Sequence, residues 1–157
     1  MSRMLTRFAA LLTALVALPA GATDATLADL PPVERWEADP TTIFDAAEID
    51  LDDFQWVARP VVVFANTDAN PAFEEQLRLL ADGLDDLTAR DVVLITDTDP
   101  DAASALRTKL RPRGFMLTLI GKDGGVKLRK PFPWDVRELS RSIDKMPMRQ
   151  REIREGE

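Results

Sequence analysis

The segment RPVVVFANTDANPAFEEQLRLL, residues 59–80, predicts the fold. It opens with a continuous apolar run, residues 60–65, which is typical of a central strand that is covered on both faces. Asn70 and Pro71 then supply an N-cap and a first helical residue. Apolar side chains follow at spacings of four and three residues, on one face of a helix, at Phe73, Leu77, Leu80, Leu84 and Leu87. A buried strand followed by an amphipathic helix is the repeating unit of an α/β sheet.

The pattern repeats along the chain. Residues 92–95 predict a second buried strand. Asp99-Pro100 resembles the first cap and proline, so a second helix is expected after it, with an apolar stripe formed by Ala103, Leu106 and Leu110.

A hairpin and a last helix complete the domain. Residues 115–120 and 126–129 predict two strands joined by a turn at Asp123-Gly124. A final helix is expected to end at Pro147, with an apolar face at Val136, Leu139, Ile143 and Met146. The predicted order is β-α-β-α-β-β-α, an α/β fold with a mixed central sheet, because the two crossovers give parallel strands and the hairpin adds an antiparallel one.

Two motifs carry a resemblance to a known family. The hairpin LIGKDGGVKLR (119–129) and the segment IDKMPMR (143–149) resemble an uncharacterised thioredoxin-like family of bacterial envelope proteins. The same domain type occurs in vertebrate matrix proteins such as equarin and the sushi-repeat proteins. The segment FQWVARP (54–60) is similar as well, so the resemblance covers about residues 51–154. It implies a thioredoxin-like domain, here over residues 51–147, with a peroxiredoxin-like redox role.

The residues at the expected active site do not support that redox role. Where thioredoxins have C-G-P-C this chain has Ala69-Asn70-Pro71-Ala72, and where peroxiredoxins have T-x-x-C it has Thr67-Asp68-Ala69-Asn70. Met116 stands at the position of the thioredoxin cis-proline. The chain has no cysteine at all, so thiol–disulfide exchange and peroxidase chemistry, which need a thiolate, are excluded.

The N-terminus predicts export. Arg3 and Arg7 precede an apolar run of eleven residues, Phe8 to Leu18, and a small-residue cleavage site. We expect a signal peptide over residues 1–22, cleaved after Ala22, and a periplasmic or secreted, soluble product without a transmembrane segment. Residues 23–50 are rich in acid and proline and predict an irregular leader, and residues 148–157 predict a charged tail.

Charge is unevenly distributed. The net charge is −7, which argues against nucleic-acid binding. Residues 107–130 nevertheless hold eight basic side chains and one acidic one, Asp123. This stretch is interpreted in three ways: a surface for an anionic ligand or an acidic partner, an ordinary solvated face, or a face screened by the acidic leader.

The candidate binding residues are Thr67 and Asn70 at the first helix start, Met116 on the third strand, and Lys122 and Arg129 on the hairpin. A helix start suits an anion, although Asn70 is equally explained as a simple cap. The acidic run 97–101 invites a calcium proposal, but it lacks the EF-hand pattern and is better explained as a capped helix start. Trp134 is interpreted as a packing residue. We expect no catalytic residues, no metal and no cofactor.

These observations favour a non-catalytic periplasmic binding or accessory module on a redox-inactive thioredoxin-like fold, whose partner is an envelope protein or an anionic ligand. Two alternatives stay open: an enzyme that uses Lys, Ser or carboxylate chemistry, and a stress-related structural protein of the envelope.

Overall fold

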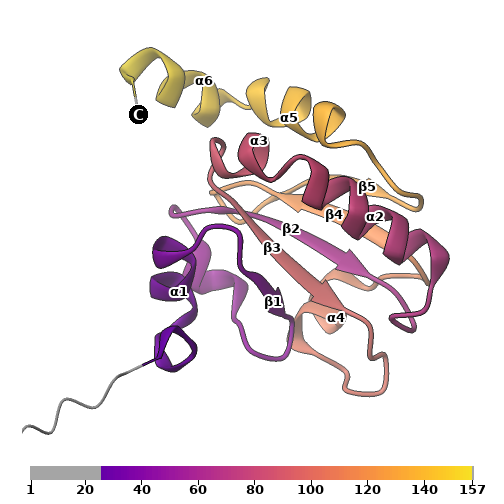
Figure 1. Ribbon diagram of the computed structural model, residues 1–157. Helices are drawn as coiled ribbons and strands as arrows, with labels where there is room; N and C mark the ends of the chain where they lie inside the picture. Colours follow the sequence, from indigo (N-terminus) through magenta and orange to yellow (C-terminus); the bar gives the residue numbers. More distant parts are fainter. Residues whose placement is uncertain (1–25, 157) are drawn as a thin grey trace, which may run out of the picture.

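A five-stranded mixed sheet forms the centre of the computed structural model, which describes residues 26–156; the predicted signal peptide lies outside them. The strand order is β1-β3-β2-β4-β5 (Figure 1). β1, β3 and β2 are parallel, and β4 is antiparallel to both β2 and β5. The strands are β1 (Ile43–Asp45), β2 (Arg59–Phe64), β3 (Val92–Asp97), β4 (Met116–Ile120) and β5 (Val126–Lys130). The predicted β-α-β-α-β-β-α order with a mixed sheet is confirmed.

Helices cover both faces of the sheet (Figure 1). One face carries α2 (Pro71–Asp82), α3 (Leu84–Thr88) and α5 (Val136–Asp144). The other face carries α1 (Pro32–Ala38), the 3-10 helix η2 (Leu51–Phe54) and α4 (Ala105–Leu110). A further 3-10 helix, η1 (Leu27–Asp29), precedes α1, and α6 (Pro147–Glu155) follows α5.

The central strand β2 divides its side chains between two apolar cores. Val62 and Phe64 belong to the core under α1 and α4, whereas Val61 and Val63 belong to the core under α2 and α5. Successive residues of a strand point to opposite faces, so a strand covered on both faces needs an uninterrupted apolar run. All six residues of β2 are buried, as the sequence predicts.

The described part of the acidic leader, residues 26–50, contains a helix and a strand, which differs from the irregular segment expected there. β1 pairs with β3, and Phe44 opposite Ile95 is fully buried. The indole of Trp36 on α1 donates a hydrogen bond of 3.2 Å to the Val92 carbonyl. A strand of three residues is too short to show a periodic pattern, so the sequence gives no signal for it.

Both predicted helices after the parallel strands have different bounds from those expected. The first helix is interrupted at Gly83, where a Cβ atom would lie 2.6 Å from Cγ1 of Val136 on α5. The second begins at Ser104, whose hydroxyl accepts a hydrogen bond of 3.0 Å from the Arg107 amide. Asp99 instead accepts from the amides of residues 101 and 102 in a turn. The cap-and-proline signal at Asp99-Pro100 therefore marks a turn rather than a helix start.

Most of the predicted charged tail, residues 148–157, belongs to a helix. α5 ends at Asp144, and Pro147 is the first residue of α6, which continues to Glu155. Glu152 of α6 is only 7% exposed. No helix within residues 26–156 is both long enough and apolar enough to cross a membrane.

Candidate functional site

The loop after β2 carries two of the predicted binding residues, and both serve the loop itself. The Asn70 side chain accepts hydrogen bonds from the amides of Ala72 (2.9 Å) and Phe73 (3.2 Å). The Thr67 hydroxyl accepts from the Ala69 amide at 3.3 Å. Asn70 is thus the N-cap of α2, and the amides that a bound anion would need are already occupied.

Met116 and Arg129 lie close together at the end of the sheet where β2 and β3 finish and β4 begins. Met116 opens β4 opposite Phe64, the last residue of β2, and its sulfur lies 3.8 Å from Nη1 of Arg129 on β5. They line a cavity of about 290 Å³, which we call the basic groove. Its lining residues are Arg111, Arg113, Phe115, Met116, Arg129, Lys130 and Pro131.

The loop from α4 to β4 shapes one wall of the basic groove. Arg111 caps α4 in the left-handed conformation, with φ of 49°, and Gly114 has φ of 62°. The chain turns at these two left-handed residues, and Arg111 and Arg113 line the same cavity as the β5 side chains. Arg129 is held in turn by a hydrogen bond that it donates to the Leu110 carbonyl at the end of α4.

The cations of the basic groove lack ionic partners within the described residues 26–156. None of Arg111, Arg113, Arg129 and Lys130 forms an ion pair there. The Lys130 ammonium lies 4.2 Å from the ring centre of Trp134, and the electron-rich face of the ring attracts the positive charge. The groove therefore combines four positive charges with an apolar floor.

Arg107 belongs to the same basic stretch, but its side chain does not line the basic groove. Its guanidinium pairs with Asp97 at 2.6 Å, and Ser104 donates to the other oxygen of that carboxylate at 2.5 Å. Asp97 is 4% exposed, so the pair is internal. Sequence reasoning missed it, because nothing in a spacing of ten residues predicts such a contact. In the described part of the chain, no group of three or more acidic side chains is arranged to hold a metal ion.

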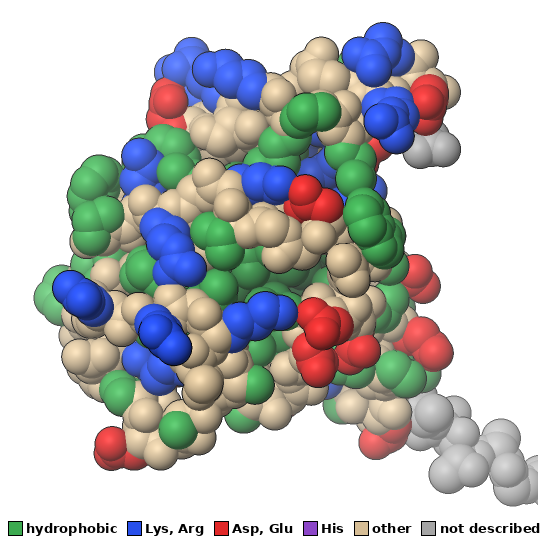
Figure 2. Space-filling model, turned by 180° about the vertical axis from the view of Figure 1, so that it is seen from behind, with side chains coloured by type: hydrophobic (Ala, Val, Ile, Leu, Met, Phe, Trp, Pro, Cys, Tyr) green, Lys and Arg blue, Asp and Glu red, His purple; other side chains and the backbone are tan. Residues whose placement is uncertain are grey.

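Within residues 26–50, no acidic side chain of the leader forms an ion pair with the basic stretch 107–130. The acidic side chain that does so is Asp52 of η2, just after the leader, which lies 3.3 Å from the Lys109 ammonium with both side chains exposed. α1 and β1 pack instead at the edge beside β3, at the opposite end of the strand order from β5. Figure 2 shows many of the basic side chains gathered on one side of this face of the molecule and a group of acidic side chains on the other. The described leader thus leaves the basic groove open.

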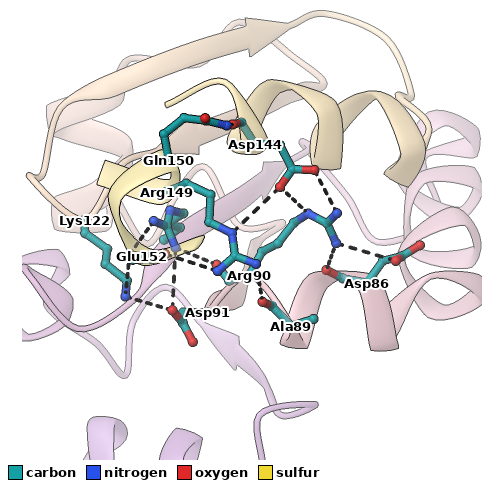
Figure 3. A network of polar contacts seen from close by, with 10 residues as sticks. Asp86, Ala89, Arg90, Asp91, Lys122, Asp144, Arg149, Gln150 and Glu152 are labelled. Atoms are coloured by element: carbon teal, nitrogen blue, oxygen red, sulfur yellow. Dashed lines mark hydrogen bonds and ion pairs between the residues drawn. The ribbon is translucent and has the colours of Figure 1, made fainter. Parts of the chain in front are cut away.

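A second charged cluster lies at the other end of the strands, where β2 begins (Figure 3). Arg59 of β2 is 1% exposed and binds the Glu152 carboxylate of α6 at 2.7 Å. Lys122 of the hairpin reaches the same carboxylate at 3.0 Å and Asp91 at 2.8 Å. Arg149 adds a third cation to Glu152 at 3.2 Å. Burial raises the pKa of Glu152, but hydrogen bonds from Arg59 and Lys122 outweigh it and lower the pKa to about 2.

The cluster continues onto the segment before β3. Arg90 binds Asp144 at the end of α5 through two hydrogen bonds of 2.9 Å each, and Arg149 donates to the Ala89 carbonyl at 3.0 Å (Figure 3). The arginine of the Met-Pro-Met-Arg motif thus braces α6 against the segment that leads into β3.

Lys122 therefore lies apart from the other predicted site residues. It follows the end of β4, whereas Met116 begins that strand. Lys122 lines a separate cavity of about 220 Å³, which we call the hairpin pocket. Its lining residues are Arg59, Gly121, Lys122, Asp123, Lys127, Met146, Pro147, Met148 and Arg151. Sequence reasoning did not find this pocket, since its walls come from three distant segments.

Comparison with solved structures supports the fold. A reduced 2-Cys peroxiredoxin of Plasmodium vivax is similar with a TM-score of 0.55 and 14% identity, over 66% of this chain and 85% of that one. The Plasmodium yoelii protein Prx1a, modified at its N-terminus, gives a TM-score of 0.50 and 17% identity, over 69% of this chain and 83% of that one. At such identities the likeness shows a thioredoxin-like fold and no activity.

Comparison by sequence identifies the family. No curated protein matches the chain. The profile described as "Domain of unknown function (DUF4174)" matches residues 50–152, which include η2, the whole of β2 to β5 and most of α6. This chain, with a thioredoxin-like fold and no cysteine, belongs to the DUF4174 family.

Proposed function

We propose that this protein is a binding module without thiol chemistry, which holds an acidic segment of another envelope protein in the basic groove. The observation that carries the proposal is the set of four cations without ionic partners in the described residues, around the apolar floor of Phe115 and Met116. The protein has a net negative charge, so these unpaired cations form a local positive patch. Such a patch attracts acidic partners over about a Debye length of 10 Å.

The position of the groove supports a ligand-binding role. β2 and β3 end at this edge of the sheet, and β4 begins there. Open α/β sheets bind ligands beyond the carboxyl ends of their parallel strands. Phe132, which follows the groove residue Pro131, is 52% exposed and lies 5.9 Å from the Lys130 ammonium, so it offers an apolar surface beside that cation. An acidic segment that also carries an apolar side chain suits this mixture of charge and apolar area.

The absence of cysteine supports a module that kept the fold and uses it for binding. The start of α2, where thioredoxins and peroxiredoxins hold the reactive thiolate, is here capped by Asn70 and preceded by an exposed loop, residues 66–69. No nucleophile of that chemistry stands near the groove, so recognition is the role that the remaining side chains suit best.

Binding is tested with a labelled peptide in which Glu and Leu alternate. We expect binding that weakens at least tenfold between about 0.05 M and about 0.5 M salt, because exposed charges are screened. The triple variant Arg111→Gln, Arg113→Gln, Arg129→Gln should lose most of the affinity. The matched control changes three exposed cations outside the groove: Arg137→Gln, Lys145→Gln and Arg154→Gln. Equal weakening in both variants would mean a response to net charge alone and would contradict the proposal.

Export is the second part of the proposal and rests on the basic residues Arg3 and Arg7 and the apolar run that follows them. Expression in a bacterium with two membranes, followed by fractionation and N-terminal sequencing, should find a periplasmic protein that starts at Thr23. A cytoplasmic protein that keeps residues 1–22 would contradict it.

A further inference from the structure

The hairpin pocket is formed by three segments that lie far apart in the sequence. Arg59 comes from the start of β2, and the hairpin supplies Gly121 to Asp123 and Lys127. Met146, which precedes α6, and the α6 residues Pro147, Met148 and Arg151 complete the lining. The same three segments carry the Phe-Gln-Trp-Val-Ala-Arg-Pro, hairpin and Met-Pro-Met-Arg motifs of the sequence. The pocket lies at the end of the sheet where β2 begins, whereas the basic groove lies where β2 ends. The two cavities share no lining residue.

Positive charge dominates the lining. Four cations face one carboxylate, that of Asp123, which is bound to Lys127 at 2.6 Å. Lys122 shares its ammonium between Asp91 and Glu152, and Glu152 also neutralises part of Arg59. Arg151 has no ion pair within residues 26–156. An anion that enters the pocket therefore meets Arg151 free and Lys122 and Lys127 close by.

Gly121 allows Lys127 to lie at the pocket. A Cβ atom at this position would stand 2.5 Å from Cε of Lys127 and 2.6 Å from Oδ1 of Asp123, closer than such atoms approach. The lysine side chain thus lies against the bare backbone of the hairpin, and its ammonium is 3.5 Å from the position where that Cβ would be.

The remaining lining is apolar and adaptable. Met146 and Met148 are half-buried and flank Pro147. Thioether side chains are flexible and polarisable, and they adjust to apolar groups of irregular shape. The volume of about 220 Å³ is below the range of drug-sized pockets, so a ligand must be small.

We propose that the hairpin pocket binds a small amphiphilic oxyanion, with the anionic head between Lys122, Lys127 and Arg151 and a short alkyl chain against Met146 and Met148. A carboxylate and a phosphate monoester share this chemistry. The proposal is separate from the binding of an acidic partner in the basic groove.

Methionine methyl groups offer a test that distinguishes the two cavities. Met146 and Met148 line the hairpin pocket, whereas Met116 lines the basic groove. The protein is labelled with carbon-13 on its methionine methyls, and the signals are assigned by single Met→Leu substitutions. Hexanoate and butyl phosphate are titrated, with hexanol and inorganic phosphate as probes that carry only one half of the chemistry.

We expect saturable shifts of the Met146 and Met148 signals with hexanoate, butyl phosphate or both, and an unmoved Met116 signal. Hexanol and inorganic phosphate should bind about tenfold more weakly, because each lacks one class of contact. The stronger of the two amphiphilic probes identifies the head group. Shifts of Met116 alone, or no shift of Met146 and Met148, would overturn the inference and leave the basic groove proposal standing.

Charge-neutralised variants complete the test. The double variant Lys127→Gln, Arg151→Gln should weaken binding about tenfold, the usual worth of charge-assisted hydrogen bonds to an oxyanion. The control Lys145→Gln, Arg154→Gln removes the same charge from exposed positions outside the pocket. An unchanged Met116 signal reports that each variant is folded. Equal affinity in the two variants would overturn the inference.

Discussion

At the scale of single residues, the Arg59–Glu152 pair is the most deeply buried charge contact between distant segments. Arg59 is 1% exposed, and its guanidinium also donates to the Arg90 carbonyl at 2.8 Å. Glu152 is surrounded by Arg59, Lys122 and Arg149. A buried cation that loses its carboxylate keeps the full cost of desolvation.

Substitution of Glu152 tests this contact. Glu152→Gln keeps the shape of the side chain and removes its charge, so we expect the free energy of unfolding to fall by about 2 kcal/mol. Urea denaturation measures the change. Glu155→Gln, an exposed carboxylate on the same helix, is the matched control and should stay within about 0.5 kcal/mol. Equal effects of the two substitutions would refute a special role for Glu152.

Trp56 is a residue under backbone strain. Its φ is 66°, and its side chain is 63% exposed, although bulky residues avoid the left-handed region. Its amide donates a hydrogen bond of 2.6 Å to the Lys122 carbonyl, which holds the conformation. Its near neighbour Phe54 is buried, so the two aromatic side chains lie in different environments.

The strain at Trp56 has a measurable consequence. Trp56→Asn should be more stable than Trp56→Ala by about 1 kcal/mol, because asparagine adopts the left-handed conformation more readily. Both variants lose the indole, so their difference isolates the backbone effect. Thermal and urea unfolding would measure it. A more stable alanine variant would show that strain does not limit stability here.

At the scale of elements, Gly83 decides where α2 ends. The apolar stripe from Phe73 to Leu87 predicts one continuous helix, but α2 ends at Asp82 and α3 begins at Leu84. Gly83 has non-helical backbone angles, φ −123° and ψ 24°, which end the helix. Val136 at the start of α5 occupies the place where a side chain at position 83 would be, so glycine is the residue that fits this tertiary contact. Both halves keep the stripe buried, which is why the helical pattern survives the break.

Gly83→Ala should therefore destabilise the protein. The added Cβ would lie 2.6 to 2.9 Å from three atoms of Val136, and we expect a loss of about 1 to 3 kcal/mol in the free energy of unfolding. The double variant Gly83→Ala, Val136→Ala should recover part of this loss relative to Val136→Ala alone, because the space is vacated. Purely additive effects would contradict a direct clash.

At the scale of the whole molecule, Glu152 links stability to pH. Hydrogen bonds from three cations lower its pKa from 4.5 to about 2 against the opposing effect of burial. Since the folded-state pKa is the lower one, this stabilisation is fully present above pH 4.5 and is lost as the pH falls toward 2. The contribution is at most about 3 kcal/mol, and solvent screening reduces it.

An acid titration measures this linkage. The free energy of unfolding of the wild type should fall between pH 4.5 and 2 more steeply than that of Glu152→Gln, so the two curves should converge in acid. The difference between the curves removes the other carboxylates from the comparison. Parallel curves would show that Glu152 titrates normally in the folded state.

The sequence by itself determined the strands β2 to β5, the hairpin turn, the faces of the main helices and the absence of thiol chemistry. These features depend on local periodicity, turn residues and composition, which a single chain displays directly. It also singled out Met116 and Arg129, which the structure brings to one groove.

Only the tertiary structure decided the role of β1 and α6, the break at Gly83 and the separation of Lys122 from the groove. It also paired Arg107 with Asp97 and Arg59 with Glu152, across 10 and 93 residues. Such contacts have no signature in a local pattern, because they depend on which segments the sheet and its helices bring together. The tertiary structure also decides which charges stay without an ionic partner in the described residues, such as those of Arg111, Arg113 and Arg129 in the basic groove.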